Sequence, residues 1–549
     1  MADENKREII TPYTLRGRRR IYTDTLAITA ENVIEELQWA IPWHMQNADE
    51  MRYLLNYEKG FQPLPREKKV RSDIDIQVVD NVANQIVVFK MGYIWGNPIL
   101  YIHRGNKDIS GSDDEANTKQ DFGVTLLNEM NEIEYVQSKD QELARFVEIC
   151  GIGHQMVDVR PKFNGLSAFE LMTLNPLFSF CIYRNSAKQE KLAGVTFRRN
   201  RYGDTYYTVF TPDRRFEILN TVSILDPITG QRTKVDKWEH LERSGEKNPL
   251  EMIPIVEFDR APDRTGCFER QISDMDALNV EVSDFANTVS QTTQEIWWGN
   301  DFDLPVDDDG KPVAPVGGQW VMTSSAAGNN PKIQALHSSM DLSGVQANIE
   351  SKRDLILEKC YVPLQSEPGG GSTGTAMSMS SGWAAAESAA SMEERMLFRG
   401  KMEIANLEIK AIHTASDVPA DSPLLTLSPS DVLPQFTRNK TYDLVSKVNA
   451  MVTMIKSGVH GRVAMETVDL FTDVAQAWAD SKEVIDRYQE AIINRAENAY
   501  VSAYTKREDA ERSQSSEKAG SDTADQIDNS PIISGFQQNV STVMRPEKR

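Results

Sequence analysis

The stretch EPGGGSTGTAMSMSSGWAAAESAASMEERM, residues 367–396, contains two patterns that are associated with chemistry. The spacing G-x-S-x-G at Gly370, Ser372 and Gly374 is that of a hydrolase nucleophile elbow, in which the serine attacks an acyl carbon. The spacing G-x-x-x-x-G-T in the same residues is one position away from a phosphate-binding P-loop. The stretch is therefore an active site, a nucleotide site, or a flexible connection before a helix.

The elements around this stretch favour the flexible connection. A nucleophile elbow needs a buried strand that runs into the turn, whereas the preceding residues, RDLILEKCYVPLQSEP, have a charged, amphipathic helical pattern that ends in two prolines. His413 and His460 follow Ser372 in the chain, but the β-α-β alternation of a hydrolase sheet is missing from the sequence. The P-loop pattern has Thr375 where the phosphate-binding lysine is required. A serine hydrolase that uses Ser372 stays the alternative hypothesis.

Other residue types give no support to a catalytic or metal site. The seven histidines include no H-E-x-x-H motif, and the four cysteines include no C-x-x-C pair, so neither a zinc site nor a disulfide framework is indicated. The run DDDG at 307–310 does not have the ligand spacing of an EF-hand and is interpreted as a turn in a small β-element. We therefore expect a protein that is not an enzyme and has no cofactor.

The composition is that of a folded protein with more than one domain. The chain has 549 residues, is 40% hydrophobic and 26% charged, and has a net charge of −21; such a length exceeds one compact core. It contains no run of 18 apolar residues and no signal-peptide pattern at its start, so we expect no membrane contact and a cytoplasmic product. The acidic excess argues against a DNA-gripping protein but suits a wall along which DNA slides. The basic run RGRRR, Arg16–Arg20, is interpreted as a solvated arm rather than a nucleic-acid site.

The periodicity predicts an α+β fold that is mainly helical. Helices are expected near 29–41 and 80–95, over 140–157, and from about 376 to 412, where roughly 35 residues would span about 50 Å. Residues 111–119 are interpreted as an acidic surface loop, 168–258 as β-hairpins that turn at 200–203 and 212–215, and 413–436 as a linker or irregular strand. Further helices are expected within 440–505, and the polar tail 506–549 is interpreted as disordered.

Two narrow apolar stripes predict a pair of helices that need neighbours. A break rich in glycine, proline and aspartate, 299–340, separates the two helical segments. The polar face of the first segment contains Asp274, Glu281, Asp284 and Asn287. The residues of the two stripes, which we predict to pack between helices and between subunits, are Met275, Leu278, Val282, Phe285 and Val289 in the first segment and Leu342, Val345, Ile349 and Ile356 in the second.

The order of these parts resembles the portal proteins of tailed bacteriophages, in the family named after the portal of phage SPP1. VDNVANQIVVFKMGYIWGNPILY (79–101) is similar to that family's N-terminal helix and G-Y-x-x-G-x-P turn, and MIPIVEFDR (252–260) to the strand before its stem. SSGWAAAES (380–388) matches the start of its long helix, and TYDLVSKVNAMVTMIKSGV (441–459) resembles its crown helix. Each motif is weak alone, whereas their order over roughly residues 50 to 495 is specific.

The resemblance implies a homo-oligomeric ring, commonly of twelve subunits, around a channel at one vertex of the phage head. It implies a wing (1–265), a first stem helix (266–297), a clip (298–340), a second stem helix (341–362), a tunnel loop (363–375), a long helix with wing return (376–436), a crown (437–505) and a tail (506–549). The implied partners are double-stranded DNA, the large terminase subunit, the head–tail connector, and the major capsid and scaffolding proteins. The expected location is the virion, after assembly in the host cytoplasm.

The resemblance also assigns two sets of site residues. In or near the clip, Trp297, Trp298 and Trp320 are candidates for docking a partner, with core packing as the other interpretation. In the tunnel loop, the residues expected to face DNA are small, neutral or flexible: Gln365, Ser366, Gly369, Gly370, Gly371, Ser372, Thr373, Gly374 and Thr375.

Overall fold

The computed structural model describes a set of segments that carry the elements named below. These segments are residues 14–15, 17–64, 74–104, 115–160, 167–225, 232–242, 245–292, 296–300, 309, 332–336, 342–364, 382–438 and 444–468, with 470–471, 474, 477–478, 480–485 and 487 beyond them. The chain divides into two compact units, Met1–Thr441 and Tyr442–Arg549, and each is treated by itself.

The first unit contains helices and strands in mixed order, which agrees with the predicted α+β class. Its described helices are α1 (Val33–Glu58), α2 (Val82–Ile94), α3 (Glu115–Ile133), α4 (Val136–Cys150), α5 (Ile272–Thr292), α6 (Leu342–Lys359) and α8 (Trp383–Thr414), with short 3-10 turns at Glu269–Gln271 and Pro423–Thr426. Its described strands are β1 (Ile21–Thr23), β2 (Leu100–His103), β3 (Ile152–Val159), β4 (Phe169–Leu174), β5 (Ser179–Arg184), β6 (Lys191–Arg199), β7 (Thr205–Phe210), β8 (Arg214–Leu225), β9 (Arg232–His240), β10 (Glu246–Lys247), β11 (Ile255–Asp259), β12 (Ile296–Asn300), β13 (Lys332–Leu336) and β14 (Val432–Gln435).

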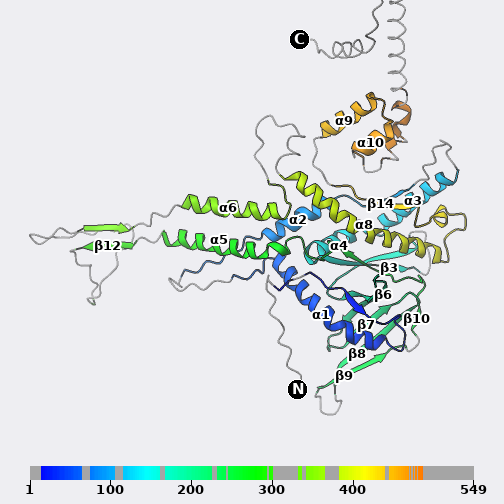
Figure 1. Ribbon diagram of the computed structural model, residues 1–549, viewed down its shortest axis with the longest axis horizontal. Helices are drawn as coiled ribbons and strands as arrows, with labels where there is room; N and C mark the ends of the chain where they lie inside the picture. Colours follow the sequence, from blue (N-terminus) through cyan, green and yellow to red (C-terminus); the bar gives the residue numbers. More distant parts are fainter. Residues whose placement is uncertain are drawn as a thin grey trace, which may run out of the picture. The chain divides into compact units, whose positions relative to one another are not determined.

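The largest described sheet runs in the order β1-β5-β6-β7-β8-β10, with β9 also paired to β8 (Figure 1). β1 is parallel to β5, and the other pairs are antiparallel. Alternate residues face α1, whose Val33, Leu37 and Ala40 are fully buried in a core with residues such as Val195 and Val209. The predicted β-hairpins over 168–258 are confirmed, since β6 and β7 join at 200–204 and β7 and β8 at 211–213.

Two expected elements differ from the structure near the middle of the first unit. The helix predicted over 140–157 ends at Cys150, because Gly151 takes a left-handed conformation (φ 78°) and the next residues form β3. β3 is the central strand of the sheet β11-β3-β4, and residues 152–157 are all buried, so the two faces of the strand do not differ in exposure. The loop predicted over 111–119 is wrong from residue 115 onward, because α3 starts there.

The long helix α8 carries charged side chains into the core of the first unit. It has 32 residues, so at 1.5 Å per residue it spans about 48 Å. The Lys401 ammonium is buried and pairs with Asp140 of α4, and it also donates to Gln155 Oε1 at 3.3 Å. Gly400 lets Phe258 of β11 approach, since a Cβ there would lie 2.4 Å from that ring. Gly382 precedes the helix with φ 83° and so marks its described start.

Glu408 of α8 makes part of the stability depend on pH. Burial raises the pKa of this carboxyl to about 8 from its usual 4.5, and the nearby Lys401 opposes the rise only partly. The folded protein therefore keeps a proton between pH 4.5 and 8 that the unfolded chain has lost, so the free energy of unfolding falls as pH rises through this window. This proton makes the free energy of unfolding fall by up to about 1.4 kcal/mol per pH unit. We expect the Glu408→Gln variant to lack this decrease, because its side chain cannot titrate. Urea unfolding at several pH values measures it, with the exposed Glu350→Gln as control; parallel profiles for Glu408→Gln and the wild type would contradict it.

The second unit begins with two helices that pack together, α9 (Leu444–Lys456) and α10 (Gly461–Val468). The helix predicted to end near Gly458 is confirmed, and Gly458 has a left-handed φ of 89°. Gly461 starts α10, and a side chain there would collide with Trp478, whose ring also lies 4.8 Å from that of His460.

Candidate assembly site on helices α5 and α6

Helices α5 and α6 lie side by side (Figure 1). In the chain, β12 comes after α5 and β13 comes before α6, and these two strands pair antiparallel. Half of the predicted apolar stripe is buried within the chain itself. Met275, Leu278 and Ile356 have 2% exposure or less, in a core that includes Tyr57 of α1 and Ile86 of α2. Val282 and Ile349 pack against the same core. These five stripe residues therefore pack the α5–α6 pair against helices α1 and α2.

The other four stripe residues are only partly covered by described residues of the chain. Phe285 and Val345 line an open hollow of about 400 Å³ between the two helices. Val289 is 38% exposed, and Leu342 is half-buried. The hollow is also lined by polar residues, namely Glu281, Asp284, Thr288, Gly344 and Asn348. The hollow thus leaves the side chains of Phe285 and Val345 accessible to a further chain.

The polar face of α5 is bound by an extended segment, residues 74–80, that precedes α2. Asn279, Ser283 and Asn287 accept hydrogen bonds from the backbone N–H groups of Asp80, Val78 and Ile76 at 2.8, 3.0 and 2.8 Å. Ser283 and Asn287 also donate to the carbonyls of Val78 and Ile76. The spacings match, because four helical residues advance about 6 Å and two extended residues about 6.6 Å.

This polar ladder changes the interpretation of the predicted polar face. Asn287, which the sequence analysis assigned to it, is only 2% exposed and serves as a rung. Glu281 and Asp274 instead face α6, where they pair with Lys352 and with Lys359, the latter at 2.6 Å. These ion pairs between α5 and α6 are partly exposed and therefore stabilise the packing of the two helices only weakly. The repeated spacing N-x-x-x-S-x-x-x-N was the signal in the sequence for the ladder.

Within the basic run Arg16–Arg20, Arg18 and Arg19 form a clamp at the base of α5, so the interpretation as a solvated arm is wrong for the buried Arg18. The Arg18 side chain has no exposed area and pairs with Glu50 of α1 at 3.1 Å and with Glu269 at 2.7 Å. Arg19 also pairs with Glu50, at 2.8 Å. Carboxylates from separate segments thus pair with Arg18 and Arg19, and charges buried as Arg18 is need partners.

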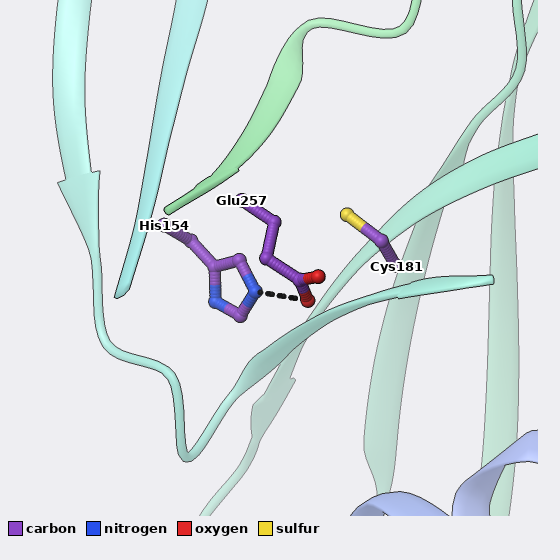
Figure 2. Close-up of side chains that lie close together, drawn as sticks. All are labelled: His154, Cys181 and Glu257. Atoms are coloured by element: carbon purple, nitrogen blue, oxygen red, sulfur yellow. Dashed lines mark hydrogen bonds and ion pairs between the residues drawn. The ribbon is translucent and has the colours of Figure 1, made fainter. Parts of the chain in front are cut away.

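Next to this clamp, His154, Cys181 and Glu257 form the cluster of described residues that could hold a metal ion (Figure 2). Both ring nitrogens of His154 already have partners: Nε2 lies 3.3 Å from Glu257 Oε2, and Nδ1 lies 2.9 Å from Ser179 Oγ. Burial opposes the charge of Glu257, but Arg264, 2.8 Å away, holds the pKa of this carboxyl well below its usual range.

The chemistry of these donors fits an ion-pair network better than a metal site. Burial raises the pKa of the Cys181 thiol to about 12, which disfavours the thiolate that a metal needs. Glu257 also accepts a hydrogen bond from Tyr183 at 2.9 Å. A metal ion would have to displace the guanidinium of Arg264. The cluster therefore joins β3, β5 and β11 electrostatically.

The remaining predicted site residues are described only in part. The tunnel-loop residues 365–375, with Ser372 among them, and Trp320 lie outside the described residues. Before them, α6 ends at Lys359 and residues 360–364 form a turn and an irregular segment. Trp297 and Trp298 are strand residues of β12, paired with Ala335 and Gln334 of β13. A two-stranded β-element is thus present between the two helices, as predicted, whereas its predicted turn at 307–310 lies outside the described residues except for Asp309.

Comparison with protein-family models gives one match. The model described as phage portal protein, SPP1 Gp6-like, matches residues 40–497. The chain belongs to this family. The portal-family resemblance found in the sequence is thereby confirmed, and the matched region runs from within α1 through both helices of the α5–α6 pair to the helices of the second unit.

The portal family is a family of structural phage proteins, which agrees with the expected lack of enzyme activity. No curated protein matches the chain. Within the described parts of this portal protein, no helix is both long and apolar enough to span a bilayer. The family motifs lie on defined elements: the G-Y-x-x-G-x-P turn joins α2 to β2, and the strand before the stem is β11.

Proposed function

We propose that this portal protein assembles into a ring at one vertex of the phage head, around a channel through which the genome is packaged and ejected. The open hollow at Phe285 and Val345 is the observation that carries the proposal. It leaves an apolar surface on paired helices that a neighbouring copy would cover. The wing, stem, clip, tunnel-loop and crown boundaries given above are part of the proposal, except that Ile296 and Trp297 belong to strand β12 and not to a stem helix; twelve is the expected subunit number.

The partners follow from this place in the head. The terminase motor would dock on the ring during packaging, and the head–tail connector would dock afterwards. The clip, with Trp297 and Trp298 on β12, is the proposed surface for both. Major capsid and scaffolding proteins would surround the wing. The net charge of −21 supports a channel wall that repels phosphates. The hydrolase alternative has no observation in its favour.

The proposed tunnel loop gives a direct test of this function. Residues 365–375 contain glycine, serine and threonine, with Glu367 as the single charge, so the loop would touch DNA without holding it. Ser372→Arg/Thr373→Arg adds two cations per subunit, and each cation can form a salt-dependent phosphate contact. We expect rings that look normal by negative-stain microscopy but package DNA slowly, with partial rescue at higher salt.

Replacing Gly369, Gly370 and Gly371 with alanine is the control, because it stiffens the loop without adding attraction. This variant should package better than the double-arginine variant. Packaging by the double-arginine rings at the wild-type rate would show that the loop does not touch DNA. A wild-type protein that stays monomeric at all salt concentrations would contradict the portal function itself.

A further inference from the structure

The turn between β6 and β7 carries arginines without acidic partners. Many arginines in the described part of the chain form ion pairs, as Arg18 and Arg260 do. Arg198, Arg199 and Arg201 are exposed, and none of the described carboxylates lies within ion-pair distance of them. In a chain with a net charge of −21, this turn is a local concentration of unpaired positive charge.

Two of these guanidinium groups lie on tyrosine rings. The Arg198 guanidinium is 5.1 Å from the ring centre of Tyr206, and that of Arg201 is 4.7 Å from the ring centre of Tyr202. Such stacking holds the planar group by its face and leaves its N–H edge open. A carboxylate can accept two parallel hydrogen bonds from that edge. Because the arginines are already oriented, binding would cost them less conformational entropy.

The backbone that carries the arginines is also fixed. Asn200 Oδ1 accepts hydrogen bonds from the N–H groups of Tyr202 and Asp204 at 2.9 and 3.0 Å. Asp204 in turn accepts from the Asn200 amide at 3.1 Å and from the Val222 N–H at 3.1 Å. The carboxylate within the turn thus serves to hold the turn together. A rigid turn with stacked, unpaired arginines is a preorganised anion-binding surface.

We propose that residues 198–202, the arginine turn, dock an acidic segment of a different protein of the phage head. This rests on the proposed place of the chain in the head. Arginine and tyrosine are enriched in protein interfaces, and Tyr202 and Val222 are 47% and 42% exposed beside the turn. A nucleic acid fits less well, since one face of each tyrosine is covered by a guanidinium and the chain's overall negative charge repels a long phosphate backbone.

Arginine-directed labelling with phenylglyoxal tests the proposal on the assembled protein. Peptide mass spectrometry would compare isolated rings, empty heads and DNA-filled heads. We expect Arg198 and Arg201 to react fully in isolated rings and about tenfold more slowly in both kinds of head, a factor that corresponds to about 1.4 kcal/mol. Protection in isolated rings would assign the turn to contacts between copies, and protection only in DNA-filled heads would assign it to DNA. Either result, or no protection at all, overturns the proposal.

A charge-removing variant gives a second measurement. Arg198→Gln/Arg201→Gln rings should form as the wild type does by native mass spectrometry but enter heads less efficiently. Lys188→Gln, at the other end of β6 and 83% exposed, is the matched control and should enter heads normally. Equal incorporation of both variants contradicts the docking role. Wild-type protein that never appears in heads would instead contradict the proposed function, so the two failures can be told apart.

Discussion

Replacing Phe285 with aspartate is expected to abolish ring formation while leaving the single chain folded. Phe285 lines the open hollow between α5 and α6, so within one chain the new carboxylate can stay in contact with water. In a ring, a neighbouring copy would bury it without a cation, and an unpaired buried charge is costly. Repeated around a ring, this cost should leave monomers, which native mass spectrometry and negative-stain microscopy would show.

Phe285→Leu is the matched control, because it keeps an apolar side chain in the hollow. It should assemble as the wild type does, and the circular dichroism of both variants should match that of the wild type. Met275 is not suitable for this test, since it is fully buried in the chain's own core and its loss would change folding. Wild-type rings from Phe285→Asp would place the subunit contact elsewhere.

Arg18→Met should have the largest effect on stability. Arg18 is the cation that pairs with Glu269, and it also shares Glu50 with Arg19. Removing it leaves the Glu269 carboxylate, whose side chain is 3% exposed, without its cation at the start of α5. Breaking a buried pair in this way costs about 3–5 kcal/mol. Urea unfolding followed by tryptophan fluorescence, with hydrogen exchange at the base of α5, would measure the loss.

Arg270→Met is the control for this measurement. It also removes an arginine near the start of α5, but the Arg270 side chain is exposed whereas that of Arg18 is buried. The Arg270 side chain is 73% exposed and pairs with Asp263, so its loss should change stability by less than about 1 kcal/mol. Equal effects of the two substitutions would mean that Arg18 is not the electrostatic clamp that its contacts indicate.

The sequence predicted those elements whose stabilising contacts follow from local periodicity. The α5 and α6 stripes, the β-hairpins and the long helix α8 each repeat an apolar pattern over many residues. The strand β3 was missed because it is buried on both faces and therefore shows no alternation. The family could be recognised from the order of weak motifs. None of these motifs predicts which other residues a given side chain contacts.

Contacts between distant segments could not be predicted in the same way. Arg18 looked like part of a solvated run until the fold brought Glu50 and Glu269 to it. The open part of the stripe likewise cannot be separated from its buried part by periodicity, since Leu278 and Phe285 are equivalent in the pattern. Only the packing of α1 and α2 against one end of α5 distinguishes them.

The polar ladder along α5 restricts how the chain can gain or lose residues. Deleting one residue within 74–80 would turn the paired N–H groups away from Asn279, Ser283 and Asn287, because extended residues alternate in direction. Inserting one residue between two rungs of the helix would rotate the following rungs by about 100°. An insertion or deletion keeps the ladder only if both segments change at once: two residues in the extended segment for every four residues in the helix. In a ring, such a compensated change would alter the length of every subunit's helix by about one turn.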